Sequence, residues 1–499
     1  MSRINTNVQS LLGQRVLGQN NRGLNTSLER LSTGLRINRG KDDPAGLIAS
    51  ENLRSEKAAI SAAIGNAERA DQVVNIAEGG LQEINSLLVE VQSLVSQSAN
   101  DAGLSSEEKE ANQLQIDSIL QTIDRIAAST SFQGTKLLNG TFDFNVSGVA
   151  ATVEDYQINA AKLQFGENRD IDVLVTQSAQ HGSLFLSVGA TSLDLSAADA
   201  SIVFEVAGSI GSREFTFGSG TTLADIAASV NTFTDVTGVS AVASGNYIEL
   251  KSNEYGSNEF VSLQIADAAG QAGGVKLASA LDEDALNSAA GTAFSALTNP
   301  VRDNGQDVGA TINGVQAVTN GKTASINTDF LDVSFELTDT GAQSLAAISA
   351  LTITGGGAQF NLGPNVDILN QVNLGIGNVA TRNLGTVANG FLDELGASKS
   401  SNVVDGNLGQ AQNIVNDAIK EVSTLRGRLG AFQKNTIGAT IRSLGVALEN
   451  TAAAESAIRD TDFAAETAAL TRSQILVQSS TQILSIANSQ PQNVLALLG

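Results

Sequence analysis

A continuous apolar stripe near each end of the chain constrains its fold more than any other feature of the sequence. In residues 456–499, large apolar side chains recur every seven positions, at Phe463, Leu470, Val477 and Leu484. This spacing predicts a helix with one apolar face. Arg472 is the only charged side chain between residues 467 and 499. A surface of this kind needs a partner, because it would otherwise cause aggregation.

The first residues of the chain supply a candidate partner. Leucines recur every seven positions there, at Leu17, Leu24 and Leu31. Residues 1–43 are therefore predicted to form a helix that lies against a helix in residues 456–499. The packing positions expected in this pair are Ile4, Val8, Leu11, Leu17, Leu24, Leu28, Leu31, Leu35, Phe463, Leu470, Val477, Leu484, Val494 and Leu495.

A second, longer heptad pattern follows the first helix. Apolar positions between residues 60 and 95 alternate steps of three and four, and the same alternation returns between residues 408 and 432. A period of 3.5 favours a left-handed coiled coil, although an ordinary bundle helix would also bury these positions. Gly79 and Gly80 are expected to weaken the helix by about 1 kcal/mol each. The predicted bundle residues are Ile60, Val74, Leu81, Ile84, Leu88, Val91, Val95, Val415, Val422, Leu425, Leu429 and Phe432.

The middle of the chain has a different composition. Residues 141–399 contain 9 Lys and Arg against 28 Asp and Glu, and 14 of the 17 Phe. Short segments of alternating polarity begin after the Asn139-Gly140 turn signal, which indicates strands. Within residues 213–265 we predict a strand, a short helix capped by Thr222, and three further strands. The expected fold is a mainly α terminal bundle or coiled coil, with paired N- and C-terminal segments and an inserted β-rich α+β outer region.

The residues needed for common catalytic or metal sites are scarce. The chain has no cysteine and one histidine, His181. We therefore expect no enzyme activity, no metal and no cofactor. The segment Asp303-Asn304-Gly305-Gln306-Asp307 is reminiscent of a calcium loop but lacks the distal glutamate, so a solvated turn is the simpler interpretation. The acidic middle is expected to repel nucleic acid and anionic membranes.

Membrane insertion is not expected. No apolar run reaches the length of a spanning helix, and the first ten residues lack the core of a cleavable signal. Export, if it occurs, would then leave the first residues in place. Seven Lys and Arg against Glu29 alone make the first 41 residues basic, a composition that also fits an anionic membrane surface.

Several motifs at the two ends resemble those of bacterial flagellins. They are INTN at residues 4–7, LSTGLRIN at 31–38, KDDPAG at 41–46, QSAN at 97–100, FQGTKLLNG at 132–140 and PQNVL at 491–495. Residues 213–265 and Ile312-Asn313-Gly314 are similar to an Ile-Asn motif of some flagellin outer domains. The resemblance covers roughly half of the chain.

The resemblance implies a structural subunit that polymerises into the flagellar filament for swimming, outside the cell. Residues 1–43 with 456–499 would form an inner shell, 44–180 with 355–455 a helical bundle with β-hairpins, and 181–354 a surface-exposed β-rich region. The implied partners are copies of the chain, a filament cap, hook-associated proteins and an export chaperone. Two alternatives stay open: a hook-filament junction protein, and a filament subunit whose outer domain is an adhesin.

The resemblance also points to a segment read by a flagellin-sensing innate receptor. It aligns with Glu90, Val91 and Leu94, and the apolar members match. The family's central arginine is replaced by Glu90, which would put repulsion where attraction is needed. Weak receptor activation is therefore expected.

Overall fold

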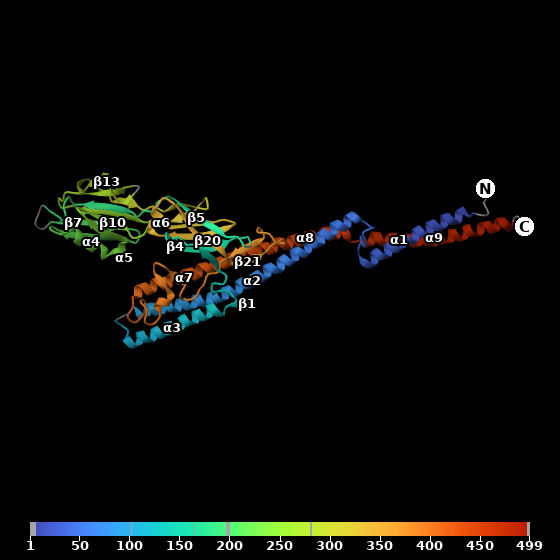
Figure 1. The fold of residues 1–499 in the computed structure, drawn as a ribbon, viewed down its shortest axis with the longest axis horizontal. Helices are drawn as coiled ribbons and strands as arrows, with labels where there is room; N and C mark the ends of the chain where they lie inside the picture. Colours follow the sequence, from blue (N-terminus) through green and yellow to red (C-terminus); the bar gives the residue numbers. More distant parts are fainter. Residues whose placement is uncertain (1–5, 101, 165, 196–199, 280–281, 497–499) are drawn as a thin grey trace. The chain divides into compact units, whose positions relative to one another are not determined.

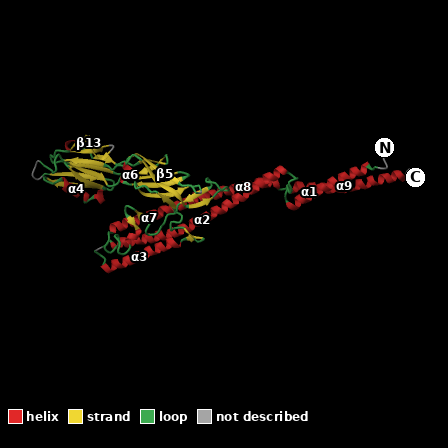
Figure 2. Ribbon diagram, viewed as in Figure 1, coloured by secondary structure: helices red, strands yellow, loops and turns green. Residues whose placement is uncertain are grey.

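The computed structural model describes residues 6–100, 102–164, 166–195, 200–279 and 282–496; for 279, 282–290 and 491–496 it describes the backbone alone. The chain divides into two compact units. One comprises Met1–Gln72, Asn361–Asn370 and Ala431–Gly499, and the other Val73–Phe360 and Gln371–Gly430. Helices form both ends of the chain and strands occupy its middle (Figure 2). The predicted fold class is confirmed.

Two terminal helices, α1 (Val8–Thr33) and α9 (Phe463–Ala496), lie side by side, with the start of α1 near the end of α9 (Figure 1). The side chain of Asn7 accepts a hydrogen bond from the Ser10 N–H at 3.0 Å and caps the start of α1. Gly34, at φ 73°, ends the helix, because glycine enters the left-handed region without strain.

The remaining long helices follow the predicted heptad segments. They are α2 (Pro44–Ser98), α3 (Ser106–Ser129), α7 (Leu408–Ala431) and α8 (Gly438–Arg459), with a π-helical turn, η3 (Phe432–Ile437), between the last two. Asp43 accepts a hydrogen bond from the Gly46 N–H at 2.9 Å, as expected for the cap of a helix that begins with proline. Ser105 and Glu108 form a capping box at the start of α3.

The structure buries every residue of the predicted bundle set. Their exposed fractions run from 0% for Leu88 to 9% for Phe432. Within the second unit, α2 and α7 are antiparallel. Gln92 Nε2 donates to Asn416 Oδ1 at 2.7 Å, and Arg426 Nη2 lies 3.6 Å from Glu78 Oε1. The heptad pattern therefore located the packed face of these helices.

Gly80 is a packing position, whereas Gly79 has open space beside it. Helix α2 continues through Gly79 and Gly80 without a break. A Cβ atom on Gly80 would lie 2.8 Å from Leu138 Cδ1 and 2.9 Å from Thr130 Oγ1. The segment that follows α3 therefore packs directly against the α2 backbone, which explains a glycine in the middle of a helix.

The first of two β cores is built from both sides of the sequence. One sheet has the order β16-β15-β5-β20-β3 and the other the order β17-β18-β19-β4. Their inner faces share one apolar cluster that includes Val173, Phe335 and Ile353. The strands are β3 (Phe144–Ser147), β4 (Val153–Ala161), β5 (Arg169–Gln177), β15 (Gly309–Ile312), β16 (Val315–Gln316), β17 (Val318–Asn320), β18 (Thr323–Asn327), β19 (Leu331–Leu337) and β20 (Ala347–Gly356).

The second β core lies within the excursion between β5 and β15. Its sheets have the orders β13-β12-β6-β10-β9 and β14-β11-β7-β8. The predicted short helix is present as α4 (Leu223–Asn231), capped by Thr222, and it buries Leu223, Ile226 and Val230. The strands are β6 (Ser183–Ser187), β7 (Ser201–Ala207), β8 (Ser212–Gly218), β9 (Val239–Ser244), β10 (Tyr247–Ser252), β11 (Phe260–Asp267), β12 (Gly274–Ser279), β13 (Asp282–Ala293) and β14 (Val301–Asn304).

The pairing corrects the predicted limits of the β region. The predicted domain limits place residues 144–177 with the helical bundle, yet β4 pairs with β19 and β5 pairs with β20. The predicted boundary at residue 180 therefore separates two β cores and divides the strands of the first from their partners. Alternating polarity identifies a strand but does not identify its neighbour.

Among the described residues, every helix is too short or too polar to span a bilayer.

Short elements complete the chain. The short elements are β1 (Ser131–Phe132), β2 (Thr135–Lys136), α5 (Thr234–Thr237), η1 (Phe294–Ala296), α6 (Asp339–Gln343), β21 (Ala358–Asn361), β22 (Gln371–Leu374), β23 (Gly385–Thr386), β24 (Gly390–Phe391) and η2 (Leu392–Leu395).

Candidate assembly surface on the paired terminal helices

Polar contacts hold α1 and α9 in a fixed antiparallel register. Near the chain ends, Asn7 Nδ2 donates to the Ala487 carbonyl at 2.8 Å. In the middle, Asn20 Nδ2 donates to Ser480 Oγ at 2.7 Å. At the other end, Arg30 Nη1 lies 3.5 Å from Glu466 Oε2. Each contact fixes the pair at a different level, so the whole length of the two helices is aligned.

Small side chains let the two helices approach closely. Gly13 and Ser27 are buried in α1, and Ser480 and Ala487 are buried in α9. A Cβ atom on Gly13 would lie 3.1 Å from Leu484 Cδ1. None of these positions belongs to the predicted packing set, which contains large apolar residues only. The signal was in the sequence, since Gly13, Asn20 and Ser27 form their own seven-residue row between the leucines.

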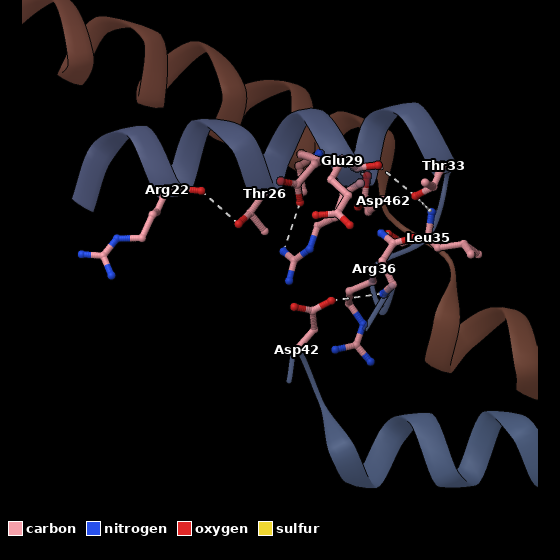
Figure 3. Close-up of polar contacts among 12 residues, drawn as sticks. Arg22, Thr26, Glu29, Thr33, Leu35, Arg36, Asp42 and Asp462 are labelled. Carbon is pink, nitrogen blue, oxygen red and sulfur yellow. Dashed lines mark hydrogen bonds and ion pairs between the residues drawn. The ribbon is translucent and has the colours of Figure 1, made fainter. Parts of the chain in front are cut away.

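A polar turn joins the helix pair to the start of α2. The Arg36 N–H donates to the Arg459 carbonyl, and the Arg36 guanidinium donates to the Ile458 carbonyl, each at 2.6 Å. The Arg39 N–H donates to Asp42 Oδ2 at 2.9 Å and lowers the pKa of that carboxyl. Figure 3 shows Leu35, Arg36 and Asp42 gathered at this turn, beside Asp462. The contacts fix the point at which the chain leaves the helix pair.

The predicted packing residues of the helix pair fall into three groups. Half-buried side chains are Leu17, Leu24, Leu31, Leu35, Leu470, Val477 and Leu484. Exposed side chains are Val8, Leu11, Leu28 and Phe463. Ile4 and the side chains of Val494 and Leu495 lie outside the described residues. The helix pair therefore covers only part of the predicted apolar set.

The outward faces of the two helices remain apolar. Val8 is 60% exposed, Leu11 58%, and Ile475, Ile483 and Ile486 are between 57% and 60% exposed. These are large aliphatic side chains on neighbouring helices, which distinguishes them from isolated surface leucines. The pair is thus a surface that still needs to be covered.

Other groups that the sequence singled out have structural roles. His181 packs on the Tyr255 ring, with centroids 3.7 Å apart. The Ser183 N–H donates to Asp303 Oδ2 at 2.9 Å, and burial raises the pKa of Asp303. Asp307 accepts a hydrogen bond from the Gly321 N–H at 2.8 Å. Burial raises the pKa of Asp307, but the hydrogen bonds from Ser257 and Gly321 together outweigh burial, so the pKa is lowered. Both carboxylates therefore hold together the connection between the two β cores.

Two further observations bear on ligand chemistry. A polar cavity of ≈ 630 Å³ lies beside this connection and is lined by Gln177, Gln306 and Thr319 among others. In the part of the chain that the structure describes, no cluster of three His, Cys, Asp or Glu side chains could hold a metal ion.

The members of the receptor-like segment differ in burial. Val91 and Leu94 lie inside the bundle, and Glu90 is exposed.

We predict that Leu484→Asp separates α1 from α9 around Gly13. A carboxylate beside the Gly13 backbone would lose part of its hydration, at a cost of about 2 kcal/mol for this half-buried position. Amide hydrogen exchange near Gly13 and Ser480 should accelerate about thirtyfold, which corresponds to that energy. Ser485→Asp adds the same charge at an exposed neighbouring position and should leave exchange unchanged. Equal exchange in both variants would contradict the assigned seam.

Three family models match the chain. The bacterial flagellin N-terminal helical region matches residues 4–143, and the bacterial flagellin C-terminal helical region matches residues 412–498. The flagellin hook IN motif matches residues 201–254 in the second β core. The first two matches include α1 with the polar turn and all of the described part of α9.

Similar proteins extend over the whole chain. Flagellin B of Vibrio cholerae serotype O1 is 29% identical over 499 residues and covers 99% of each chain. Flagellin B of Helicobacter pylori is 28% identical over 534 residues, again over 99% of each chain. Among solved structures, FliC from Burkholderia pseudomallei is 14% identical, over 73% of this chain and 99% of that chain, with a TM-score of 0.23. FlgL from Xanthomonas campestris is 12% identical, over 80% and 98%, with a TM-score of 0.26.

Proposed function

We propose, from the premise that this chain belongs to the bacterial flagellin family and is a structural subunit of the extracellular flagellar filament, that it polymerises with copies of itself through the outward faces of α1 and α9. One observation carries this proposal. The helix pair leaves Val8, Ile475 and Ile486 exposed although it is held in register along its length. Further copies can cover this surface.

Identical subunits make the geometry of assembly simple. When one patch of a subunit contacts a different patch of the next, the contact repeats without closing and generates a helical fibre. We propose the same partners that the family resemblance implies: a filament cap, hook-associated proteins and an export chaperone. We also propose that the chain performs no catalysis, in keeping with a structural family.

Seeded polymerisation tests the proposal. Short filament fragments are mixed with the purified full chain, and filament mass is followed by sedimentation and electron microscopy. We expect filaments of constant diameter. Double substitution of Ile475 and Ile486 by Gln should raise the concentration needed for growth about a hundredfold or more, because two buried aliphatic side chains are worth about 3 kcal/mol or more. Exposed Gln474 and Gln482, changed to Asn, provide the matched control on the same helix.

We further propose three layers in the filament subunit: an inner layer of α1 and α9, a helical layer of α2, α3, α7 and α8, and an outer layer of the two β cores.

The chain enters and leaves the second core at neighbouring points, since a Cβ atom on Gly182 would lie 2.9 Å from the Asp303 carbonyl oxygen. Excision of residues 183–302 should therefore preserve folding and polymerisation, measured by circular dichroism and sedimentation. Loss of polymerisation by a folded excision variant would show that the second core takes part in assembly.

Recognition by an innate receptor is proposed to be weak. Glu90 is the exposed member of the receptor-like segment, and its charge is opposite to that of the family's arginine. Glu90→Arg with Gln92→Arg is expected to raise the response of reporter cells at least tenfold. Because Gln92 donates to Asn416 in the bundle, Glu90→Arg alone serves as the control with intact packing. Strong activation by the unmodified monomer would contradict the proposal.

A further inference from the structure

The polar cavity beside the connection of the two β cores has the size of a ligand site. Its volume of ≈ 630 Å³ falls in the range of about 300–1,000 Å³ that small-molecule sites occupy. Both cores contribute to its lining, with Gln177 at the end of β5, Leu277 in β12 and Thr319 in β17. The cavity is formed by the β cores and their connection alone, so it is separate from the faces of α1 and α9 proposed for polymerisation.

The lining combines hydrogen-bond donors with acceptors. Gln177, Asn304 and Gln316 each carry a side-chain amide, which has an N–H donor group and a carbonyl acceptor. Thr319 adds a hydroxyl. A hydroxyl group on a ligand also donates and accepts, so it can bond with either end of an amide. A ligand with several neighbouring hydroxyl groups is therefore a good match for this set.

The charges at the cavity favour a neutral ligand. Among the lining residues that the structure describes none is Lys or Arg, so a phosphate or carboxylate would find no counter-charge. Asp307 is already held by donors, since Oδ1 accepts from the Gly321 N–H at 2.8 Å and Oδ2 from Ser257 Oγ at 2.6 Å. Burial raises the pKa of Asp303, because the charged carboxylate is costly there. Neither carboxylate therefore requires a cationic ligand.

The wall of the cavity is preformed. Gln180 and Gln306 exchange two backbone hydrogen bonds, at 2.8 and 2.9 Å, where the chain enters and leaves the second core. Gln306 Nε2 also donates to the Ser178 carbonyl at 2.8 Å, which holds this side chain against the connection. A Cβ atom on Gly305 would lie 2.5 Å from the Gly256 carbonyl oxygen, so these segments pack backbone to backbone. A rigid wall lowers the entropy cost of binding.

Two lining side chains offer surface to C–H groups. The His181 ring packs on Tyr255 with centroids 3.7 Å apart, and Leu277 is half-buried in β12. A sugar ring holds its C–H groups and hydroxyls in fixed relative positions, whereas a linear polyol loses rotational freedom when it binds. Ring-shaped polyhydroxyl compounds are therefore favoured over linear ones.

We propose that this cavity binds a neutral saccharide of about the size of a disaccharide. The amides of Gln177, Asn304 and Gln316 bond the sugar hydroxyls, and His181 with Leu277 contacts the ring C–H groups. The inference goes beyond polymerisation, and it gives a defined site to the adhesin alternative that the sequence left open.

Saturation-transfer NMR and calorimetric titration of the full-length, unassembled chain test the inference. The neutral probes are maltose, cellobiose, lactose and chitobiose. Sialyllactose serves as an anionic sugar, and spermidine as a cation without hydroxyl groups. We expect at least one neutral disaccharide to bind, and sialyllactose and spermidine to compete poorly with it. Seeded polymerisation of the same preparation is measured separately, so a failure of filament formation is distinguished from a failure of sugar binding.

Amide variants locate the site. Gln177→Ala with Gln316→Ala should weaken binding of the disaccharide about tenfold or more, because its hydroxyls lose two hydrogen-bonding partners. The matched control is Gln157→Ala with Gln264→Ala, which removes one exposed glutamine from each β core outside the cavity lining. Thermal melting checks that both double variants remain folded, as expected for exposed side chains.

Three results would overturn the inference. The first is the absence of binding by all four neutral disaccharides at about 10 mM. The second is equal affinity in the cavity variant and the control variant, which would place binding elsewhere on the chain. The third is stronger competition by spermidine or sialyllactose than by the neutral sugars, because charge and not the hydroxyl pattern would then select the ligand.

Discussion

Removal of residues 461–499 is expected to leave a folded chain that forms no filaments. The truncation ends just after α8, so it retains the Arg459–Glu51 ion pair of 2.7 Å and the bond from Arg36 to the Ile458 carbonyl. It removes all of α9 and with it half of the proposed assembly surface. Burial of each exposed isoleucine of α9 by a neighbouring copy is worth about 2 kcal/mol, so their joint loss prevents growth altogether.

Sedimentation after seeding, electron microscopy and thermal melting measure this result. The melting of the α2, α3 and α7 helices should be unchanged, because their buried residues make no use of α9. The variant lacking residues 183–302 is the control, since it loses more residues and is expected to polymerise. Filaments formed by the 461–499 truncation would contradict the role assigned to α9.

The second large effect is a pH dependence centred on Glu421 in α7. Burial raises the pKa of Glu421 from 4.5 to about 7, the Gly385 N–H partly opposes this with a 3.2 Å hydrogen bond, and Asp155 and Asp417 add to the increase. The folded chain therefore keeps this proton to a higher pH than the unfolded chain. The free energy of unfolding is therefore highest below pH 4.5, where Glu421 is protonated in both states. It falls by about 3 kcal/mol as pH rises to about 7, because the unfolded chain ionises first.

Denaturant unfolding at several pH values between 4.5 and 8 checks this expectation. Glu421→Gln keeps an acceptor for the Gly385 N–H and cannot ionise, so its advantage over the unmodified chain should grow by about 3 kcal/mol across that range. Glu83→Gln on the exposed face of α2 removes the same charge elsewhere and should show a constant difference. Parallel curves for Glu421→Gln and the unmodified chain would refute the assignment.

Local periodicity was sufficient to predict the long helices and the buried face of α2 and α7, although several predicted packing residues of the terminal pair are exposed. A step of three and four residues describes one side of a helix whatever lies opposite, which is why Leu81, Leu88 and Val422 could be placed in a core before any partner was known. The same pattern also predicted that the helices at the two ends of the chain pack against each other. The row of small residues through Gly13 and Ser27 was equally readable from the sequence, and it sets how close the terminal helices lie.

Long-range contacts decided the rest. The strand periodicity of residues 153–177 could not reveal that β4 meets β19 and β5 meets β20, because a period of two specifies a face and no partner. Gly80 reads as a weak helix position until Leu138 is seen against its backbone. Glu421 is one of 52 acidic residues in the sequence, and only folding sets it beside Asp155 from a distant segment. Sequence determined which surfaces are apolar; the tertiary structure determined which surfaces meet, because contacts between distant segments leave no local period.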